Sequence, residues 1–264
     1  MITMSKPLAY IVGVYLGDAY ISGSGRCFEQ YSIDKDFLVN VSKNLSRISK
    51  YPVTIKEAEY KTSSGYRLYC FDRDLCDYLV AATRNKQCVP DTIPLKRCPE
   101  TQALCEGYLD AEGWVAKSKK LSTYTKHPLY RIGVGNTNLN VLSGVVYRME
   151  SFGIQHGKLI CSSRKDAKDF YTFEIEKRSY MKSGMKFSIR RKQARLEEYI
   201  KDIPKRPWNK GLTKYSSDLV KQIGKSSGET KKVNCANGTF HPESNFNTSQ
   251  RLNAKDPYED RDTV

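Results

Sequence analysis

The chain has 264 residues, and its 44 Lys and Arg against 29 Asp and Glu give a formal net charge of +15. This excess favours polyanionic partners, nucleic acids in particular. A hydrophobic fraction of 39% predicts a folded chain rather than a disordered basic tail. No apolar stretch approaches the roughly 20 residues of a membrane-spanning helix. The N-terminal pattern is not that of a signal peptide, so we expect a cytoplasmic, organellar or phage-encoded protein without a membrane partner.

The first predicted helix lies in an apolar stretch, YIVGVYLGDAY at residues 10–20, which has a relative later in the chain. LCEGYLDAEGW at residues 104–114 aligns with it without gaps, which pairs Gly13 with Gly107 and Asp18 with Glu112. Small residues four apart lie on one face of a helix and let another backbone approach closely. The repeat therefore predicts two related halves whose motif helices pack against each other.

The segments after each motif also repeat. In the first half, two strands, a helix, two strands and a helix are predicted over residues 19–33, 34–51, 53–62, 66–71 and 72–83. The second half has the same order over residues 113–121, 129–136, 137–154, 158–163, 170–177 and 178–187. Residues 91–102, with two prolines, are the predicted linker. We therefore predict an α+β fold of two αββαββα halves, at 1–95 and 96–200, followed by a basic extension at 201–264.

Each motif ends in a carboxylate, Asp18 or Glu112, at a helix C-terminus, where the macrodipole disfavours negative charge. If the helices pack through their small residues, these carboxylates meet at one end of the seam. Two neighbouring carboxylates repel each other unless divalent cations lie between them. We therefore predict that Asp18 and Glu112 are metal ligands, with Mg²⁺ as the cation that prefers oxygen ligands. Ordinary amphipathic helices with solvated terminal acids are the alternative.

The two motifs in their two halves resemble the LAGLIDADG homing endonucleases in their single-chain form. CEGYLDAEG matches the family pattern well, whereas IVGVYLGDA has Leu16 in place of the earlier acid and Ala19 in place of the final glycine. Both keep the penultimate acid, which the family uses to bind metal. The resemblance covers about residues 8–200 and implies a DNA-binding saddle built from two four-stranded antiparallel sheets.

The resemblance implies a monomeric, site-specific endonuclease that cuts both strands of a long double-stranded DNA target and leaves 3′ overhangs. Two or three Mg²⁺ ions, or Mn²⁺ in their place, would support phosphodiester hydrolysis. An intron-borne or free-standing mobile element is the expected source. An RNA maturase that binds intron RNA and a non-cleaving DNA-binding regulator are alternatives on the same scaffold. The presence of both motif acids favours cleavage.

Family members also carry an amide side chain before the long helix of each half and a basic residue that leads into the last helix. By this resemblance Asn136 takes the amide position and Arg190, in FSIRRKQARLEEY, takes the basic one. The matching positions in the first half lie near Ser32 and at Lys96 or Arg97. We expect Arg190, with Lys117 or Lys96, to stabilise the charge that builds on the phosphate. A solvated basic surface is the alternative.

Strand side chains alternate between the two faces of a sheet, so every second residue can face the major groove. Lys117 and Lys119 share one face of their predicted strand. In the last predicted strand, the wetter alternate set begins at Thr172 and continues through Glu174 and Glu176 to Arg178. The side chains predicted to contact DNA are Lys117, Lys119, Arg131, Thr172 and Arg178, although any half-buried sheet shows the same alternation.

After about residue 201 the composition becomes basic, rich in Ser and Gly and poor in apolar residues. RPWNKGLTK at residues 206–214 resembles the short modular (NUMOD-like) DNA-binding repeats that are appended to homing nucleases. Its predicted DNA contacts are Arg206, Trp208, Asn209 and Lys210. A disordered basic tail is the alternative, and no role is predicted for residues 233–264.

Overall fold

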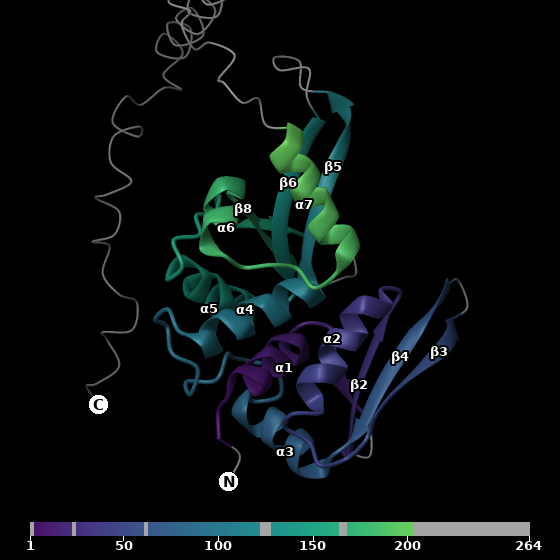
Figure 1. The fold of residues 1–264 in the computed structure, drawn as a ribbon. Helices are drawn as coiled ribbons and strands as arrows, with labels where there is room; N and C mark the ends of the chain where they lie inside the picture. Colours follow the sequence, from purple (N-terminus) through teal and green to yellow (C-terminus); the bar gives the residue numbers. More distant parts are fainter. Residues whose placement is uncertain (1–2, 23–24, 61–62, 122–127, 164–167, 203–264) are drawn as a thin grey trace, which may run out of the picture. The chain divides into compact units, whose positions relative to one another are not determined.

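The computed structural model of the chain describes residues 3–22, 25–60, 63–121, 128–163 and 168–202 (Figure 1). They belong to one compact unit, Met1–Ile203, and a second unit, Pro204–Val264, lies outside the described residues. The predicted DNA-binding repeat falls in that second unit, with Arg206, Trp208, Asn209 and Lys210. Within the described ranges, no helix is long and apolar enough to cross a membrane.

Both halves have the predicted αββαββα order. The elements of the first half are α1 (Lys6–Leu16), β1 (Tyr20–Ile21), β2 (Cys27–Ser32), α2 (Lys35–Leu45), β3 (Val53–Tyr60), β4 (Ser63–Phe71) and α3 (Arg73–Ala82). Those of the second are α4 (Pro99–Glu112), β5 (Gly113–Leu121), β6 (Pro128–Asn136), α5 (Leu139–Glu150), β7 (Ile160–Ser162), β8 (Phe170–Ile175) and α6 (Lys177–Ser183). A further helix, α7 (Arg190–Asp202), follows the second half.

Each half contains one four-stranded antiparallel sheet, in the orders β1-β2-β4-β3 and β5-β6-β8-β7. The predicted α+β class with two antiparallel sheets is therefore confirmed. One face of each sheet packs into the core through residues such as Phe28 and Leu68 in the first sheet and Val134 in the second. The alternate residues form the other face, which we call the open face and which carries charged side chains.

Helix α4 begins earlier than the composition suggested. Cys98 is its N-cap and Pro99 its first residue, so residues 99–102 of the predicted linker are helical. Proline suits this position because its missing N–H would have no partner in the first turn and its fixed φ matches the helix. Only the first part of the 91–102 segment therefore links the two halves.

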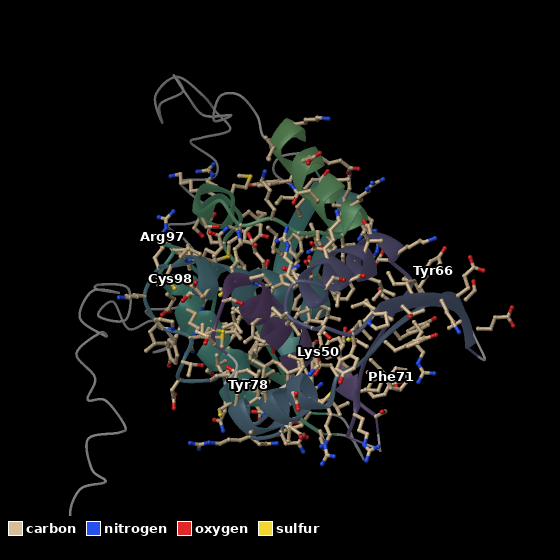
Figure 2. The ribbon with its side chains drawn as sticks, turned by 60° about the horizontal axis from the view of Figure 1, so that its bottom comes forward. Lys50, Tyr66, Phe71, Tyr78, Arg97 and Cys98 are labelled. Carbon is tan, nitrogen blue, oxygen red and sulfur yellow. The ribbon has the colours of Figure 1, made fainter. Side chains whose placement is uncertain are left out.

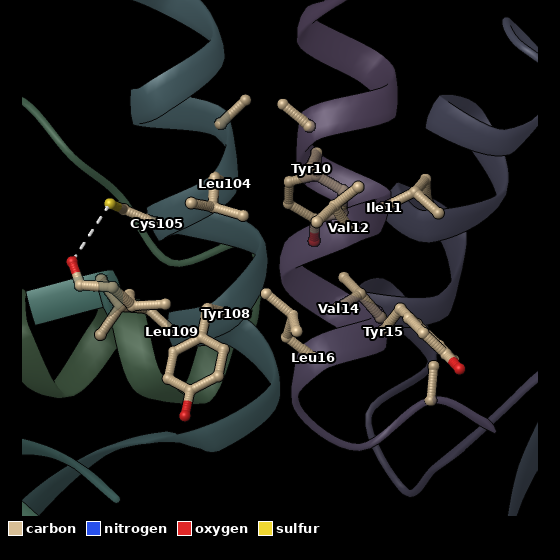
Figure 3. Packing of buried hydrophobic residues seen from close by; sticks show 14 of the residues in the cluster. Tyr10, Ile11, Val12, Val14, Tyr15, Leu16, Leu104, Cys105, Tyr108 and Leu109 are labelled. Carbon is tan, nitrogen blue, oxygen red and sulfur yellow. Dashed lines mark hydrogen bonds between the residues drawn. The ribbon is translucent and has the colours of Figure 1, made fainter. Parts of the chain in front are cut away.

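Helices α1 and α4 lie side by side along the centre of the unit (Figure 1). A Cβ atom built on Gly13 would lie 2.2 Å from the Leu104 carbonyl oxygen, and one on Gly107 would lie 2.2 Å from the Tyr10 carbonyl oxygen. The backbones therefore touch at the two glycines that the repeat aligns, as predicted. Figure 3 shows the apolar side chains, such as Leu16 and Tyr108, that fill the rest of this seam.

Candidate functional site

The two motif acids lie at the same end of the α1–α4 seam. Helix α1 ends at Leu16, which leaves Asp18 two residues beyond it, and Glu112 is the last residue of α4. Burial, followed by the negative charge of Asp18, raises the pKa of Glu112 to about 7. Partial removal from water also raises the pKa of Asp18. The structure thus brings the two carboxylates together, while their role as metal ligands stays a prediction.

Two lysines, Lys86 and Lys192, compensate the negative ends of these helices. The Lys86 amine donates a hydrogen bond to the Gly17 carbonyl oxygen at 2.9 Å. The Lys192 amine donates to the carbonyl oxygen of Asp110 at 2.7 Å and to that of Leu109 at 3.3 Å. A cation at a helix C-terminus interacts favourably with the macrodipole. An amine therefore lies at the C-terminus of each motif helix. Its positive charge offsets the unfavourable interaction between the motif acid and the negative end of the helix dipole.

Both amines also act on the carboxylates. Burial lowers the pKa of Lys86, and it lowers that of Lys192 to about 8. In return, the positive charges of the two lysines lower the pKa of Asp18 and of Glu112 against the larger effect of burial. The site is therefore a cluster of two acids and two amines. Sequence reasoning identified the acids and missed both lysines.

The turn that carries Lys86 has an uncommon backbone. Arg84, Asn85 and Lys86 have φ angles of 48°, 54° and 63°, a left-handed conformation that residues other than glycine seldom adopt. Hydrogen bonds hold the turn: the Lys86 N–H donates to the Thr83 hydroxyl at 3.0 Å, and the Asn138 amide donates to the Lys86 carbonyl at 2.9 Å. The only local sequence signal was Asn85, since asparagine tolerates this conformation better than most residues.

Asn136 contacts the second acid directly. Its side-chain amide donates to Glu112 Oε1 at 3.1 Å, and its oxygen accepts from the Asn138 N–H at 2.8 Å. In the first half, the Ser32 hydroxyl accepts from the Asp34 N–H at 3.0 Å, so Ser32 occupies the matching place before α2. Lys86, Glu112 and Asn136 line one cleft of about 600 Å³.

The donors present suit a hard divalent cation. Carboxylate oxygens are the protein ligands that Mg²⁺ prefers. The raised pKa values of Asp18 and Glu112 mean that their ionised forms are disfavoured, and a bound cation would stabilise those forms. Across the part of the chain that the structure describes, no group of three or more His, Cys, Asp or Glu could hold a metal ion. Two carboxylates with water and phosphate as the other ligands is a set that magnesium commonly uses. The residues therefore fit a magnesium site.

Two other predicted cations, Arg190 and Lys96, lie just inside the start of α7 and just before α4. Arg190 is exposed at the start of α7, where its backbone N–H donates to the Asp36 carboxylate at 2.6 Å. Lys192, two residues later, faces another side of the helix and reaches the seam instead. Lys96 precedes the N-terminus of α4, whereas Glu112 ends this 14-residue helix, a separation of about 20 Å. The position of Lys96 disagrees with the expectation that it flanks the reacting phosphate beside Glu112, while the expected role of Arg190 stays a prediction.

Lys117, one of the two predicted contacts on β5, is not on the open face. Lys117 lies opposite Tyr130, on the face that α7 covers, and its amine pairs with the Glu198 carboxylate at 2.9 Å. The alternation of β5 could not show which face the helix covers. The side chain of Lys119 lies outside the described part of the structure.

The predictions for β6 and β8 are met in part. Arg131 is on the open face and pairs with Glu174 at 3.0 Å, and Thr172 shares that face. The strand ends at Ile175, so Arg178 lies in the first turn of α6 and not on the sheet. The strand stops before Glu176 because this residue is the N-cap of α6: its carboxylate accepts hydrogen bonds from the first N–H groups of the helix.

The other acid of the second motif has a structural role. Asp110 is 1% exposed and accepts hydrogen bonds from the Tyr10 hydroxyl at 2.7 Å and from the Ser188 N–H at 2.8 Å. Burial raises its pKa to about 6, although these hydrogen bonds oppose the shift. Asp110 therefore fastens the segment before α7 to the α1–α4 seam, and this segment leads to Lys192.

No family model matches the chain. It is similar to the uncharacterized protein MJ0398 of Methanocaldococcus jannaschii, with 27% identity over 218 residues that cover 76% of this chain and 74% of the relative. Among solved structures, it is similar to I-DmoI in complex with DNA and Mn, with 16% identity and a TM-score of 0.46 over 68% of this chain and 94% of that chain.

Two further structures have comparable scores. Full-length DUF199/WhiA from Thermatoga maritima has 8% identity and a TM-score of 0.48 over 88% of this chain and 69% of that chain. The homing endonuclease I-WcaI bound to its DNA recognition sequence has 13% identity and a TM-score of 0.45 over 72% and 87%. These values are too low to assign the chain to a family, so its function is inferred from the site itself.

Proposed function

We propose that the protein is a metal-dependent endonuclease that hydrolyses phosphodiesters in double-stranded DNA. The observation that carries this proposal is the meeting of Asp18 and Glu112 at the ends of two packed helices, with the amines of Lys86 and Lys192 beside them. The resemblance of both motifs to those of LAGLIDADG homing endonucleases agrees with it. Magnesium as the cation, a mobile-element origin and action as a monomer are parts of the same proposal.

The residues of the cluster have separate tasks in such a reaction. Asp18 and Glu112 would hold the divalent ions, which when bound activate water and stabilise the leaving oxygen. The amide of Asn136 holds the Glu112 carboxylate in one orientation. Lys86 and Lys192 stabilise negative charge that builds on the phosphate. With a pKa of about 8, Lys192 is mostly protonated at neutral pH and is able to give up its proton.

The open faces of the sheets are suited to bind DNA. Each carries an arginine paired with a glutamate across neighbouring strands, Arg67 with Glu29 and Arg131 with Glu174. The Arg131 and Glu174 side chains are both exposed, and an exposed pair is worth little, so Arg131 can leave its partner for a base or a phosphate. Glu29 is buried, so Arg67 is held more firmly in its pair. Phe71, labelled in Figure 2, is 61% exposed on the first sheet and offers an apolar surface beside these charges.

Cleavage of a randomised DNA duplex library in Mg²⁺ tests the proposal directly. Wild type is compared with Asp18→Asn and Glu112→Gln, and the matched control is Asp74→Asn, an equal change at an exposed acid of α3. We expect wild type and the control to cut and both site variants to bind DNA without cutting. Cutting by either site variant would contradict the assignment of the acids. Binding by wild type without any cutting would instead favour a maturase or a regulator.

Binding of DNA should also depend steeply on salt. Each phosphate that the protein neutralises contributes a slope of about −0.9 to the plot of log affinity against log salt concentration. A chain with a net charge of +15 is expected to make several such contacts. A flat response to salt would contradict the DNA-binding part of the proposal.

A further inference from the structure

A second cavity, of about 380 Å³, lies between α1, α2, α4 and the segment before α7. It shares no lining residue with the cleft that contains Glu112. Four basic side chains line it, and they come from separate places in the chain: Lys6, Lys43, Arg47 and Lys186. We call this the basic cavity.

Helix α2 directs a regular polar row toward the basic cavity. Asn40, Lys43, Asn44 and Arg47 all line the cavity, and their spacing of three, four and seven residues is that of one helix face. The other face of α2 is buried through apolar residues that include Phe37 and Val41. The row therefore lies where α2 turns toward α4 and the segment before α7, and not on an isolated outer surface.

The positive charge of the basic cavity is only partly compensated by the described residues. No ion pair joins Lys6, Lys43, Arg47 or Lys186 to a described acid, whereas the open-face arginines each have a glutamate partner. Two carboxylates also line the cavity: that of Glu106, which accepts from the Gln102 amide at 2.9 Å, and that of Asp110, which is buried and accepts two hydrogen bonds. Four cations against two carboxylates leave an excess of positive charge around one volume, and a bound anion would offset that excess.

We propose that the basic cavity binds a compact polyphosphate group, either the triphosphate of a nucleotide or free inorganic polyphosphate. Its volume lies in the range of about 300–1,000 Å³ that small-molecule sites occupy. A triphosphate brings several negative charges into a space that four cations surround. A nucleic-acid strand carries one charge per phosphate and uses exposed rings for base stacking. The rings that line this cavity, those of Tyr10 and Phe187, are both buried.

This inference goes beyond the proposed endonuclease and does not rest on it. The basic cavity is lined by neither Asp18 nor Glu112 and by neither Lys86 nor Lys192; Asp110, which lines it, has only a structural role in the site. Failure of the cleavage experiment would therefore leave it intact.

Isothermal titration calorimetry of the full chain tests the proposal. Sodium tripolyphosphate, ATP and inorganic phosphate are titrated in buffer that contains EDTA, at about 0.15 M salt to screen non-specific attraction. We expect tripolyphosphate and ATP to bind at one site and inorganic phosphate to bind much more weakly. Equal affinities for tripolyphosphate and ATP would indicate a site for the phosphate chain alone, and tighter ATP binding a nucleotide site.

Variants distinguish binding in the basic cavity from non-specific attraction to the protein's net positive charge. The Lys43→Ala/Arg47→Ala double variant should weaken binding by about tenfold or more, as expected for lost charge-assisted hydrogen bonds. Lys186→Ala, from a different segment, should weaken it as well. The control Lys182→Ala/Lys201→Ala removes the same two charges from α6 and α7 and should change affinity by less than about twofold.

Three results would overturn the proposal. The first is the absence of saturable binding, and the second is equal weakening in the double variant and its control. The third is a double variant that keeps its affinity for polyphosphate but loses affinity for single-stranded RNA, which would make the cavity a nucleic-acid surface. The substituted side chains of Lys43 and Arg47 are exposed, so the variant should fold, and its melting temperature verifies this.

Discussion

Gly13→Ala is the sharpest test of the seam on which the site is built. Two effects of the new methyl group oppose each other. In a helix interior, alanine is favoured over glycine by about 1 kcal/mol. At Gly13, however, the added Cβ would lie 2.2 Å from the Leu104 carbonyl oxygen, where ordinary contact begins at 3.4 Å, so α1 and α4 would have to separate by about 1.2 Å.

The clash decides the sign of the effect. The neighbour is a backbone atom of the partner helix and cannot rotate away, so the cost should lie at or above the upper end of the 1–3 kcal/mol that overpacking typically takes. After the gain in helix propensity, we expect the free energy of unfolding to fall by about 2 kcal/mol. Separation of the helices also stretches the 2.7 Å hydrogen bond from Tyr10 to Asp110.

Urea unfolding followed by circular dichroism measures this change, with the slope checked for constancy. Gly144→Ala, within α5, is the matched control. Its Cβ would meet a methyl group of Val89 at 3.0 Å, which can give way by a few tenths of an ångström, so we expect a change within about 1 kcal/mol. If Gly13→Ala were as stable as wild type, the close approach of α1 and α4 would be refuted.

Three further predictions concern the site. The pKa of Glu112 is raised from 4.5 to about 7, so this residue costs stability as the pH rises through that window. Without divalent ions, Glu112→Gln should therefore stabilise the protein at pH 8 by about 1–3 kcal/mol and not at pH 4, and equal effects in urea unfolding would contradict this. Lys192→Met should raise the pKa of Glu112 and move the acid limb of the cleavage profile to higher pH, while Lys182→Met should leave the profile unchanged. Asn85→Gly should raise the melting temperature by relieving a left-handed residue worth about 1 kcal/mol, whereas Ala81→Gly in α3 should lower it.

The order of elements was predictable because it depends on local patterns. Alternation of apolar and polar residues marks strands such as β2 and β8, and the repeated small residues mark the contact of α1 with α4. The errors occurred where one side chain changes the local structure. Pro99 begins a helix instead of interrupting one, and Glu176 caps α6, so the strand ends at Ile175, three residues before Arg178.

The meeting of Asp18 and Glu112 was predictable from the sequence, because each acid follows a helix that packs through its own glycine. The sequence could not determine which cations would join them. Lys86 reaches Gly17 only through a left-handed turn, and Lys192 reaches the end of α4 only because the segment before α7 folds back onto the seam. Lys117 likewise faces away from the open face because α7 covers its side of β5. Backbone turns and contacts between distant segments leave no periodic pattern in a sequence, so these side-chain positions depend on the three-dimensional packing of the chain.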